Sequence, residues 1–159
     1  MSQHIQLPIA FSEPAQLVLY LRYGDPRKPG WEERWMTEWA IQSRFRWFPK
    51  NKLYLHSQFK NILEKVFSQL EVLGLQNEIA KVSKCFDKKT DSKGVLSVHA
   101  WGAALDILPQ KQYTNMAKWS QPFLKVFQDY HIWCGQTSVQ APQNFHQFCL
   151  VPSEPNVSH

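Results

Sequence analysis

Cysteine is scarce in this sequence of 159 residues, which contains only Cys85, Cys134 and Cys149 and no Cys-x-x-Cys pair. An odd, widely spaced set indicates neither a disulfide framework nor a zinc ribbon, so we expect a reduced, intracellular site of synthesis. No apolar run approaches the ~18 residues of a membrane span, and the beginning of the chain has no basic start followed by an apolar stretch. The sequence therefore predicts neither membrane insertion nor a signal peptide.

Charged residues are also few, at 19%, whereas aromatic residues reach 14% and include 7 Trp and 10 Phe. This composition excludes a disordered or coiled-coil chain and provides the core of a single domain, residues 1–159. The 18 Lys and Arg exceed the 13 Asp and Glu, which gives a formal net charge of +5. Such a surface favours an anionic partner, nucleic acid or cell wall alike.

Two segments have the periodicity and the end signals of helices. Residues 57–73 place apolar side chains three and four residues apart and are followed by Gly74, a residue that commonly ends a helix. Residues 120–130 begin with Ser120, a preferred N-cap, and have Pro122 in the first turn. We expect both segments to be helices.

Tryptophan recurs every four positions at Trp31, Trp35 and Trp39. This spacing places three indoles on one side of a helix. We therefore predict a helix over residues 31–41 whose indoles pack on the core. The alternative is an exposed row of indoles that stacks on sugars or bases.

Short apolar and aromatic stretches at 95–108 and 145–151 have the character of strands. Helices first and strands later indicate an α+β fold, with a small antiparallel or mixed sheet and helices on one face. Pro and Gly interrupt the first residues repeatedly. They predict an N-terminal wrapping segment, 1–50, with one short helix or strand over 16–23, before a core domain over 53–151.

A histidine and an aspartate converge in the most informative stretch, residues 97–106. If residues 102–108 form a strand, Ala104 and Asp106 share one face, and His99 lies just before it and can turn back over that face. A neutral imidazole and a carboxylate are suitable ligands for zinc. A hydrogen-bonded structural His–Asp pair is the alternative.

A zinc site needs a further ligand. His146 is the best placed, because its short aromatic strand can run next to the first one and aim its ring at the same pocket. Cys149 is an alternative, since thiolate also binds zinc. The other candidates are His4, His56, His131 and His159.

Residues 97–106 read Ser-x-His-x-x-Gly-x-Ala-x-Asp, and His146 follows downstream in an aromatic strand. This combination resembles the zinc D-alanyl-D-alanine carboxypeptidase family, which includes bacterial D,D-peptidases and phage L-alanyl-D-glutamate peptidases. Residues 119–124 resemble the helix before the last strands of that family. Residues 132–135 resemble its Trp-Gly-Gly turn, with Cys134 in place of one glycine. The resemblance implies a small antiparallel sheet flanked by helices, a fold shared with the hedgehog signalling domain.

The same resemblance implies a catalytic metal site. His99, Asp106 and His146 would be the three ligands of Zn²⁺, with water in the open fourth position. Ser97 would lie near the substrate or steady the loop by a hydrogen bond. The implied substrate is a peptidoglycan stem peptide, cut by an endolysin or tail-associated lysis protein of a phage. Such a protein is made in the bacterial host cytoplasm and acts at the cell wall or in the virion, where phage structural proteins are possible partners.

The sequence departs from this family at two places. The general base is normally an Asp or Glu three residues before the last His, and here that position holds Gln143, which cannot take a proton from water at neutral pH. Where the family often has a substrate-binding Arg, this chain offers only Lys88 and Lys89. The alternative is thus an inactive zinc-binding structural or peptide-binding module of a phage particle. Nucleic acid is not expected as a partner, because no binding motif is recognised and the cations are scattered.

Overall fold

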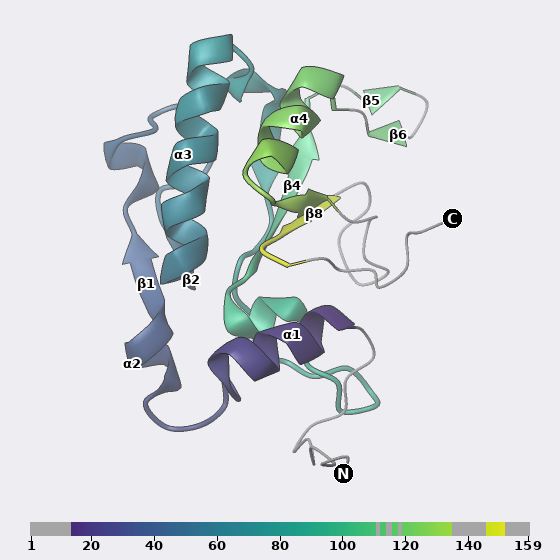
Figure 1. The fold of residues 1–159 in the computed structure, drawn as a ribbon. Coiled ribbons are helices and arrows are strands. Elements are labelled where there is room, and N and C mark those ends of the chain that lie inside the picture. The colour runs from purple at the N-terminus through teal and green to yellow at the C-terminus, as the bar shows by residue number, and fades with distance from the viewer. Residues whose placement is uncertain (1–13, 111, 114–115, 118, 135–145, 152–159) are drawn as a thin grey trace.

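The computed structural model describes residues 14–110, 112–113, 116–117, 119–134 and 146–151 (Figure 1). Its fold is of the α+β class, as the sequence predicts. The helices are α1 (Pro14–Tyr23), α2 (Trp31–Trp35), α3 (Ser57–Leu73) and α4 (Gln121–Asp129), with 3₁₀ turns η1 (Ile41–Ser43), η2 (Gln76–Glu78) and η3 (Val98–Trp101). The strands are β1 (Met36–Trp39), β2 (Leu53–His56), β3 (Ile79–Val82), β4 (Ala104–Pro109), β5 (Gln112–Tyr113), β6 (Met116–Ala117), β7 (Trp133–Cys134) and β8 (His146–Cys149).

A four-stranded antiparallel sheet in the order β3-β4-β8-β7 forms the centre of the molecule. Strands β1 and β2 form a separate two-stranded sheet, and so do β5 and β6. In the pairing of β4 with β8, Asp106 lies opposite Gln147 and Ile107 lies opposite His146. Because paired residues point to the same side of a sheet, this register decides which side chains of β8 reach Asp106.

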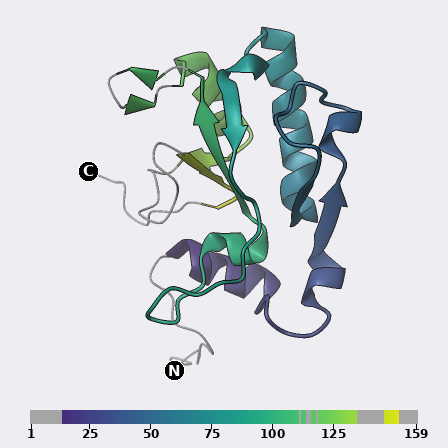
Figure 2. The same ribbon diagram turned by 180° about the vertical axis from the view of Figure 1, so that it is seen from behind.

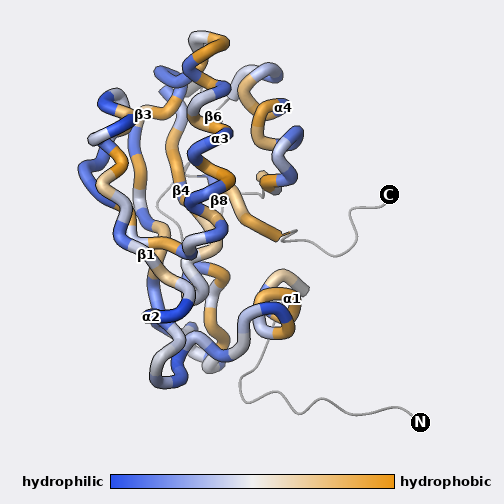
Figure 3. The backbone as a smooth tube through the Cα atoms, turned by 60° about the vertical axis from the view of Figure 1, so that its left-hand side comes forward, coloured by the Kyte–Doolittle hydropathy of each residue, from blue (hydrophilic) through white to orange (hydrophobic). Residues whose placement is uncertain are grey.

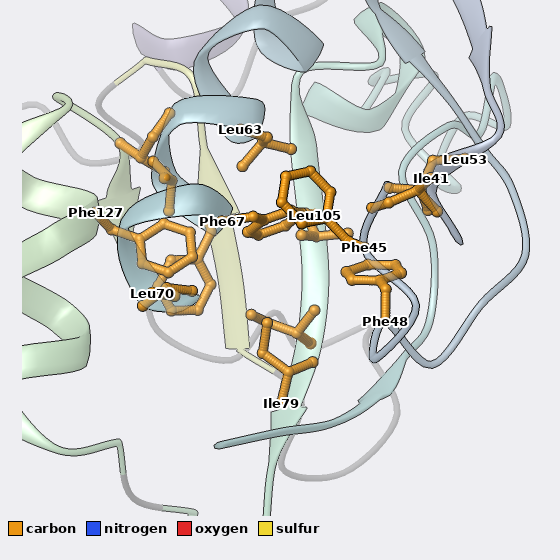
Figure 4. Close-up of a cluster of buried hydrophobic side chains, with 14 of the residues drawn as sticks. Ile41, Phe45, Phe48, Leu53, Leu63, Phe67, Leu70, Ile79, Leu105 and Phe127 are labelled. Carbon is orange, nitrogen blue, oxygen red and sulfur yellow. The ribbon is translucent and has the colours of Figure 1, made fainter. Parts of the chain in front are cut away.

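Two clusters of buried side chains pack against the sheet. The larger one lies between the sheet, α3 and α4, where Leu63 and Phe67 of α3 meet Leu105 of β4 and Phe127 of α4 (Figure 4). The smaller one joins α1 and η3 to the beginning of β4, at the lower end of the molecule in Figures 1 and 2. All six residues of β4 are buried, and Figure 3 shows this strand as mostly hydrophobic. β4 is therefore the strand on which both clusters are built.

The two long helical predictions are confirmed. Helix α3 spans Ser57–Leu73 and ends at Gly74, whose φ of 70° is left-handed. Helix α4 begins after Ser120, whose hydroxyl oxygen accepts a hydrogen bond from the backbone N–H of Phe123. The caps that the sequence indicates are the caps that the structure uses.

The helix predicted over residues 31–41 is wrong. The helix α2 ends at Trp35, and the next residues form β1, which pairs with β2 from Met36 opposite His56 to Trp39 opposite Leu53. Trp31 packs in the smaller cluster and Trp39 in the larger one. The three indoles therefore do not form one row. The pairing of β1 with β2 and the packing of the indoles in two separate clusters determine the conformation here, and the helical spacing of the indoles does not.

The shorter segments agree with the predictions in part. Residues 14–23 form the helix α1, which packs on η3. Strand β4 confirms the second part of the predicted 95–108 strand segment, and β8 confirms most of the predicted 145–151 segment. The first part of the 95–108 segment forms the turn η3 instead. Among the described residues, no helix is long and apolar enough to cross a membrane.

Candidate metal centre

A short turn brings the predicted histidine back over its strand. The hydroxyl oxygen of Ser97 accepts a hydrogen bond from the backbone N–H of His99 and so caps η3. Gly102 ends η3 with a φ of 63°. A Cβ at Gly102 would lie 2.7 Å from the backbone nitrogen of His56 and 2.6 Å from Cε of Met36. Only glycine fits there, and the tight turn leads directly into β4.

The turn places His99 against Asp106, as the sequence predicts. Nε2 of His99 lies 3.1 Å from Oδ2 of Asp106, and the two side chains are only 3% and 2% exposed. On the other side of the ring, Nδ1 of His99 lies 3.1 Å from the backbone carbonyl oxygen of Cys85. Since a carbonyl oxygen only accepts, Nδ1 of His99 carries a proton, and Nε2 is the nitrogen that faces the carboxylate.

A neutral imidazole in this position would turn a lone pair to the carboxylate and need a cation beside it, whereas a doubly protonated ring would donate its Nε2–H to the carboxylate. Among the described residues, Oδ1 of Asp106 is a buried oxygen with no hydrogen-bond partner. Two ligands of a tetrahedral zinc ion, each bound at about 2.0–2.2 Å, lie about 3.3–3.6 Å apart. The 3.1 Å between His99 and Asp106 is slightly shorter than that separation and is also the length of a hydrogen bond, while a histidine that donates its other ring N–H to a carbonyl is typical of metal ligands. The pair supplies two of the three protein ligands that a zinc site needs, and a proton on the imidazole is the alternative.

His146, the third predicted ligand, does not reach this pair. It lies opposite Ile107 and therefore on the α3 and α4 side of the sheet, whereas Asp106 points to the other side. The indole N–H of Trp119 donates a hydrogen bond of 2.8 Å to Nδ1 of His146. Burial lowers the pKa of His146, so the ring is neutral at pH 7, with its proton on Nε2.

The residue that the structure places beside the pair is Gln147. It lies opposite Asp106, and its amide nitrogen is 3.4 Å from Nε2 of His99. Cys85 supplies a carbonyl oxygen, and burial raises the pKa of its thiol, which disfavours the thiolate that binds metals. Within the described part of the chain, no three His, Cys, Asp or Glu side chains form a group that could hold a metal.

The other predicted site residues lie apart from the pair or outside the described residues. Lys88 forms an ion pair with Glu32 of α2, and that lysine, together with the Tyr54 hydroxyl, holds the pKa of Glu32 below its usual value. Lys89 is exposed. Gln143, at the predicted base position, lies outside the described residues.

A second buried histidine, His56, has a different environment. Its Nδ1 accepts the backbone N–H of Gln58 and so caps α3. The ring is stacked on Trp35 at 5.4 Å between centroids and lies 4.2 Å from the ring of Tyr23. Burial in this apolar box lowers the pKa of His56 to about 4. His56 is a neutral structural residue, not a member of the candidate metal centre.

No pattern in the sequence indicates Gln147, Trp119 or the carbonyl group of Cys85. Alternation along β8 shows that residues 146 and 147 point to opposite sides, but only the register shows which of them faces Asp106. Every residue has a backbone carbonyl, so the sequence cannot indicate which carbonyl accepts a hydrogen bond from a histidine ring N–H.

Comparisons with models of protein families, with curated proteins and with solved structures find no match for this chain. The resemblance to zinc carboxypeptidases therefore depends on the sequence motifs at 97–106, 119–124, 132–135 and 146 alone.

Proposed function

We propose that this chain is a zinc-binding protein of the peptidoglycan-peptidase type, with hydrolysis weakened by Gln143. The observation that carries the proposal is the buried pair of Nε2 of His99 and Oδ2 of Asp106, which face each other 3.1 Å apart. The Ser-to-Asp motif around them supports the cell-wall stem peptide as the substrate class. Bound zinc would supply an acidified water and polarise a peptide carbonyl.

A specific observation favours the second candidate, an inactive structural or peptide-binding module of a phage particle. The two side chains of the pair are 3% and 2% exposed, and a catalytic zinc site keeps one position open, whereas a structural site is closed. Gln143 would orient water without accepting its proton. The two candidates share the metal pair and differ in turnover.

The zinc content of purified, metal-repleted protein tests the pair. We expect about one zinc per chain in the wild type, and its loss in His99→Ala and in Asp106→Asn, which removes the charge at nearly constant volume. Cys149→Ser should retain the metal. Elemental analysis that finds no zinc in the wild type, or equal zinc in wild type and both pair variants, contradicts the proposal.

Hydrolysis of purified peptidoglycan and of D-Ala-D-Ala and L-Ala-D-Glu peptides separates the two candidates. We expect weak or no release of products by the wild type, because loss of a positioned general base commonly lowers the rate about 100- to 10,000-fold. Gln143→Glu should raise the rate if the active site is otherwise complete, and Gln143→Ala is the control. A wild-type rate of about 1 per second or faster would show that another residue is the base. No hydrolysis by either protein, with zinc bound, would favour the structural module.

A further inference from the structure

Helix α1 turns its amide side chain inward and leucines outward. Gln16 is only 4% exposed, and its amide nitrogen donates a hydrogen bond of 2.8 Å to the backbone carbonyl oxygen of Leu96. Leu21, in contrast, is 57% exposed, and Leu17, one turn earlier on the same side, is half-buried. A helix at the surface of a domain normally turns polar residues outward. The outer side of α1 at Leu17 and Leu21, here called the leucine face, is apolar instead.

Helix α1 is fixed on the domain with this face outward. On its inner side Ala15 and Leu19 are fully buried in the smaller cluster, against η3. At its end the indole N–H of Trp31 donates a hydrogen bond of 2.7 Å to the backbone carbonyl oxygen of Tyr23. Figures 1 and 3 show α1 at the lower end of the molecule, and Figure 3 shows it as mostly hydrophobic. The leucine face is therefore a convex surface that the packing of the helix keeps on the outside.

Three cations lie around the leucine face. Arg22 follows Leu21 directly, and Lys28 lies in the turn after α1. Lys93 lies in the turn of the loop 90–96, which the hydrogen bond of Gln16 joins to α1 and which runs beside α1 in Figures 1 and 2. All three cations are exposed, and none forms an ion pair within the part of the chain that the structure describes.

The carboxylates that lie closest to these cations in the chain are engaged. Asp25 is buried and forms an ion pair of 3.2 Å with Arg27. Oδ1 of Asp91 accepts hydrogen bonds from two backbone N–H groups of its own turn. Glu33 of α2 is an exposed carboxylate farther along the chain. The exposed charges next to the leucine face are therefore positive, and they favour an anionic partner.

An anionic bilayer surface uses both parts of this arrangement. Leucines on the outer side of a helix enter the boundary between headgroups and acyl chains, and cations beside them bind anionic headgroups. Nucleic acid would use the cations but would leave Leu21 without an apolar contact. A convex helix also offers no groove for a peptide, whereas a fluid lipid surface adapts to its shape.

We propose that α1 is a membrane-surface helix, whose leucine face enters the headgroup region of an anionic bilayer while Arg22, Lys28 and Lys93 bind the lipid headgroups. The helix has 10 residues, about half of the ~20 that a membrane span needs, so it lies on the membrane and does not cross it. The inference goes beyond the proposed function and does not depend on the zinc site.

Co-sedimentation of the full chain with lipid vesicles tests the leucine face. We expect the wild type to bind vesicles of phosphatidylcholine with about 30% phosphatidylserine and to bind pure phosphatidylcholine much more weakly. Leu21→Ser should lower the partition coefficient about 10-fold, because the apolar contact is lost. Val72→Ser is the matched control, since Val72 is 77% exposed on α3, and it should bind like the wild type. Both replaced side chains are exposed, so the melting temperature should not change.

The cations are tested on the same vesicles. Arg22→Gln and Lys28→Gln should each lower the partition coefficient about 5-fold, and added salt should weaken binding of the wild type. The inference is overturned if the wild type does not bind the anionic vesicles, if it binds both vesicle types equally, or if Leu21→Ser binds no more weakly than Val72→Ser. Binding to a DNA oligonucleotide in place of vesicles would assign the cations to nucleic acid and would also overturn it. His99→Ala should bind vesicles like the wild type, so the zinc proposal and this one can fail separately.

Discussion

The three described histidines that lie in or near the sheet differ in where each ring carries its proton. His99 donates through Nδ1 to a carbonyl, and its Nε2 faces a carboxylate. In His56 and His146 Nδ1 is the acceptor, and the proton lies on Nε2. Of these three rings, His99 is the one whose Nε2 faces a carboxylate.

The pKa of His56 makes stability depend on pH. Its value of about 4 in the folded protein lies below the 6.5 of an unperturbed histidine, so the unfolded chain binds the extra proton between these pH values. Stability from His56 is present above pH 6.5 and is lost as pH falls toward 4, by on the order of 3 kcal/mol in all. Urea unfolding at pH 7, 6, 5 and 4.5 should show this decline.

His56→Gln is the control for that series. The pKa of His146 is also lowered, and its contribution to the pH dependence has the same sign. The difference between wild type and His56→Gln therefore isolates His56, and it should shrink as pH falls. A difference that is constant between pH 7 and 4.5 contradicts the assignment.

Two glycines with left-handed backbone test the tight turn before β4. Gly102 has a φ of 63° and backbone 2.7 Å from where a Cβ would lie, whereas Gly94 has a φ of 79° and nothing within 4 Å. Gly94→Ala should lower the free energy of unfolding by about 1–2 kcal/mol through φ alone. Gly102→Ala should lower it by about 2–4 kcal/mol, since steric strain is added. Equal losses in thermal or urea unfolding would show that the close approach to His56 is not rigid.

At the scale of the elements, α3 and α4 end in the same way with different residues. After α3 the backbone N–H of Leu75 bonds to the carbonyl of Leu70, and after α4 that of Ile132 bonds to Phe127. Both are Schellman ends, which require a left-handed residue. Gly74 fills this position after α3, and His131, with a φ of 60°, fills it after α4.

His131→Gly should therefore stabilise the protein, and Gly74→Ala should destabilise it. A non-glycine residue in this conformation costs about 1–2 kcal/mol, part of which the greater freedom of an unfolded glycine offsets. We expect a gain of about 0.5–1 kcal/mol for His131→Gly and a loss of about 1 kcal/mol for Gly74→Ala, read from urea unfolding midpoints. A loss for His131→Gly would mean that the imidazole makes a contact worth more than the strain.

The elements differ in how far the sequence predicts them. Both long helices are predictable because their periodicity and caps are local, as Ser120 and Gly74 show. The segment 36–39 is not, because its conformation is set by pairing with β2, a contact that no local pattern reports. The spacing of the indoles satisfies a helix equally well, and tertiary contacts decide.

At the scale of the whole molecule, the candidate metal centre also combines a part that local sequence predicts and a part that long-range contacts determine. His99 and Asp106 belong to one continuous segment, so strand alternation and the turn at Gly102 suffice to predict that they meet. The side of the sheet on which His146 lies depends on the register between β4 and β8, and a shift of one residue reverses it. A long-range register is not encoded in any local pattern, and this is why Gln147 appears where a histidine is expected.

The position of β8 inside the sheet also has a consequence for how the protein is made. β8 lies between β4 and β7. The edge of β4 that pairs with β8 therefore has no hydrogen-bond partner until residues 146–149 have left the ribosome. An unpaired, buried-type strand edge is a template for pairing with other chains. Nascent chains that pause before this point are exposed to intermolecular association, and the yield of native protein should depend on how quickly synthesis passes from β4 to β8.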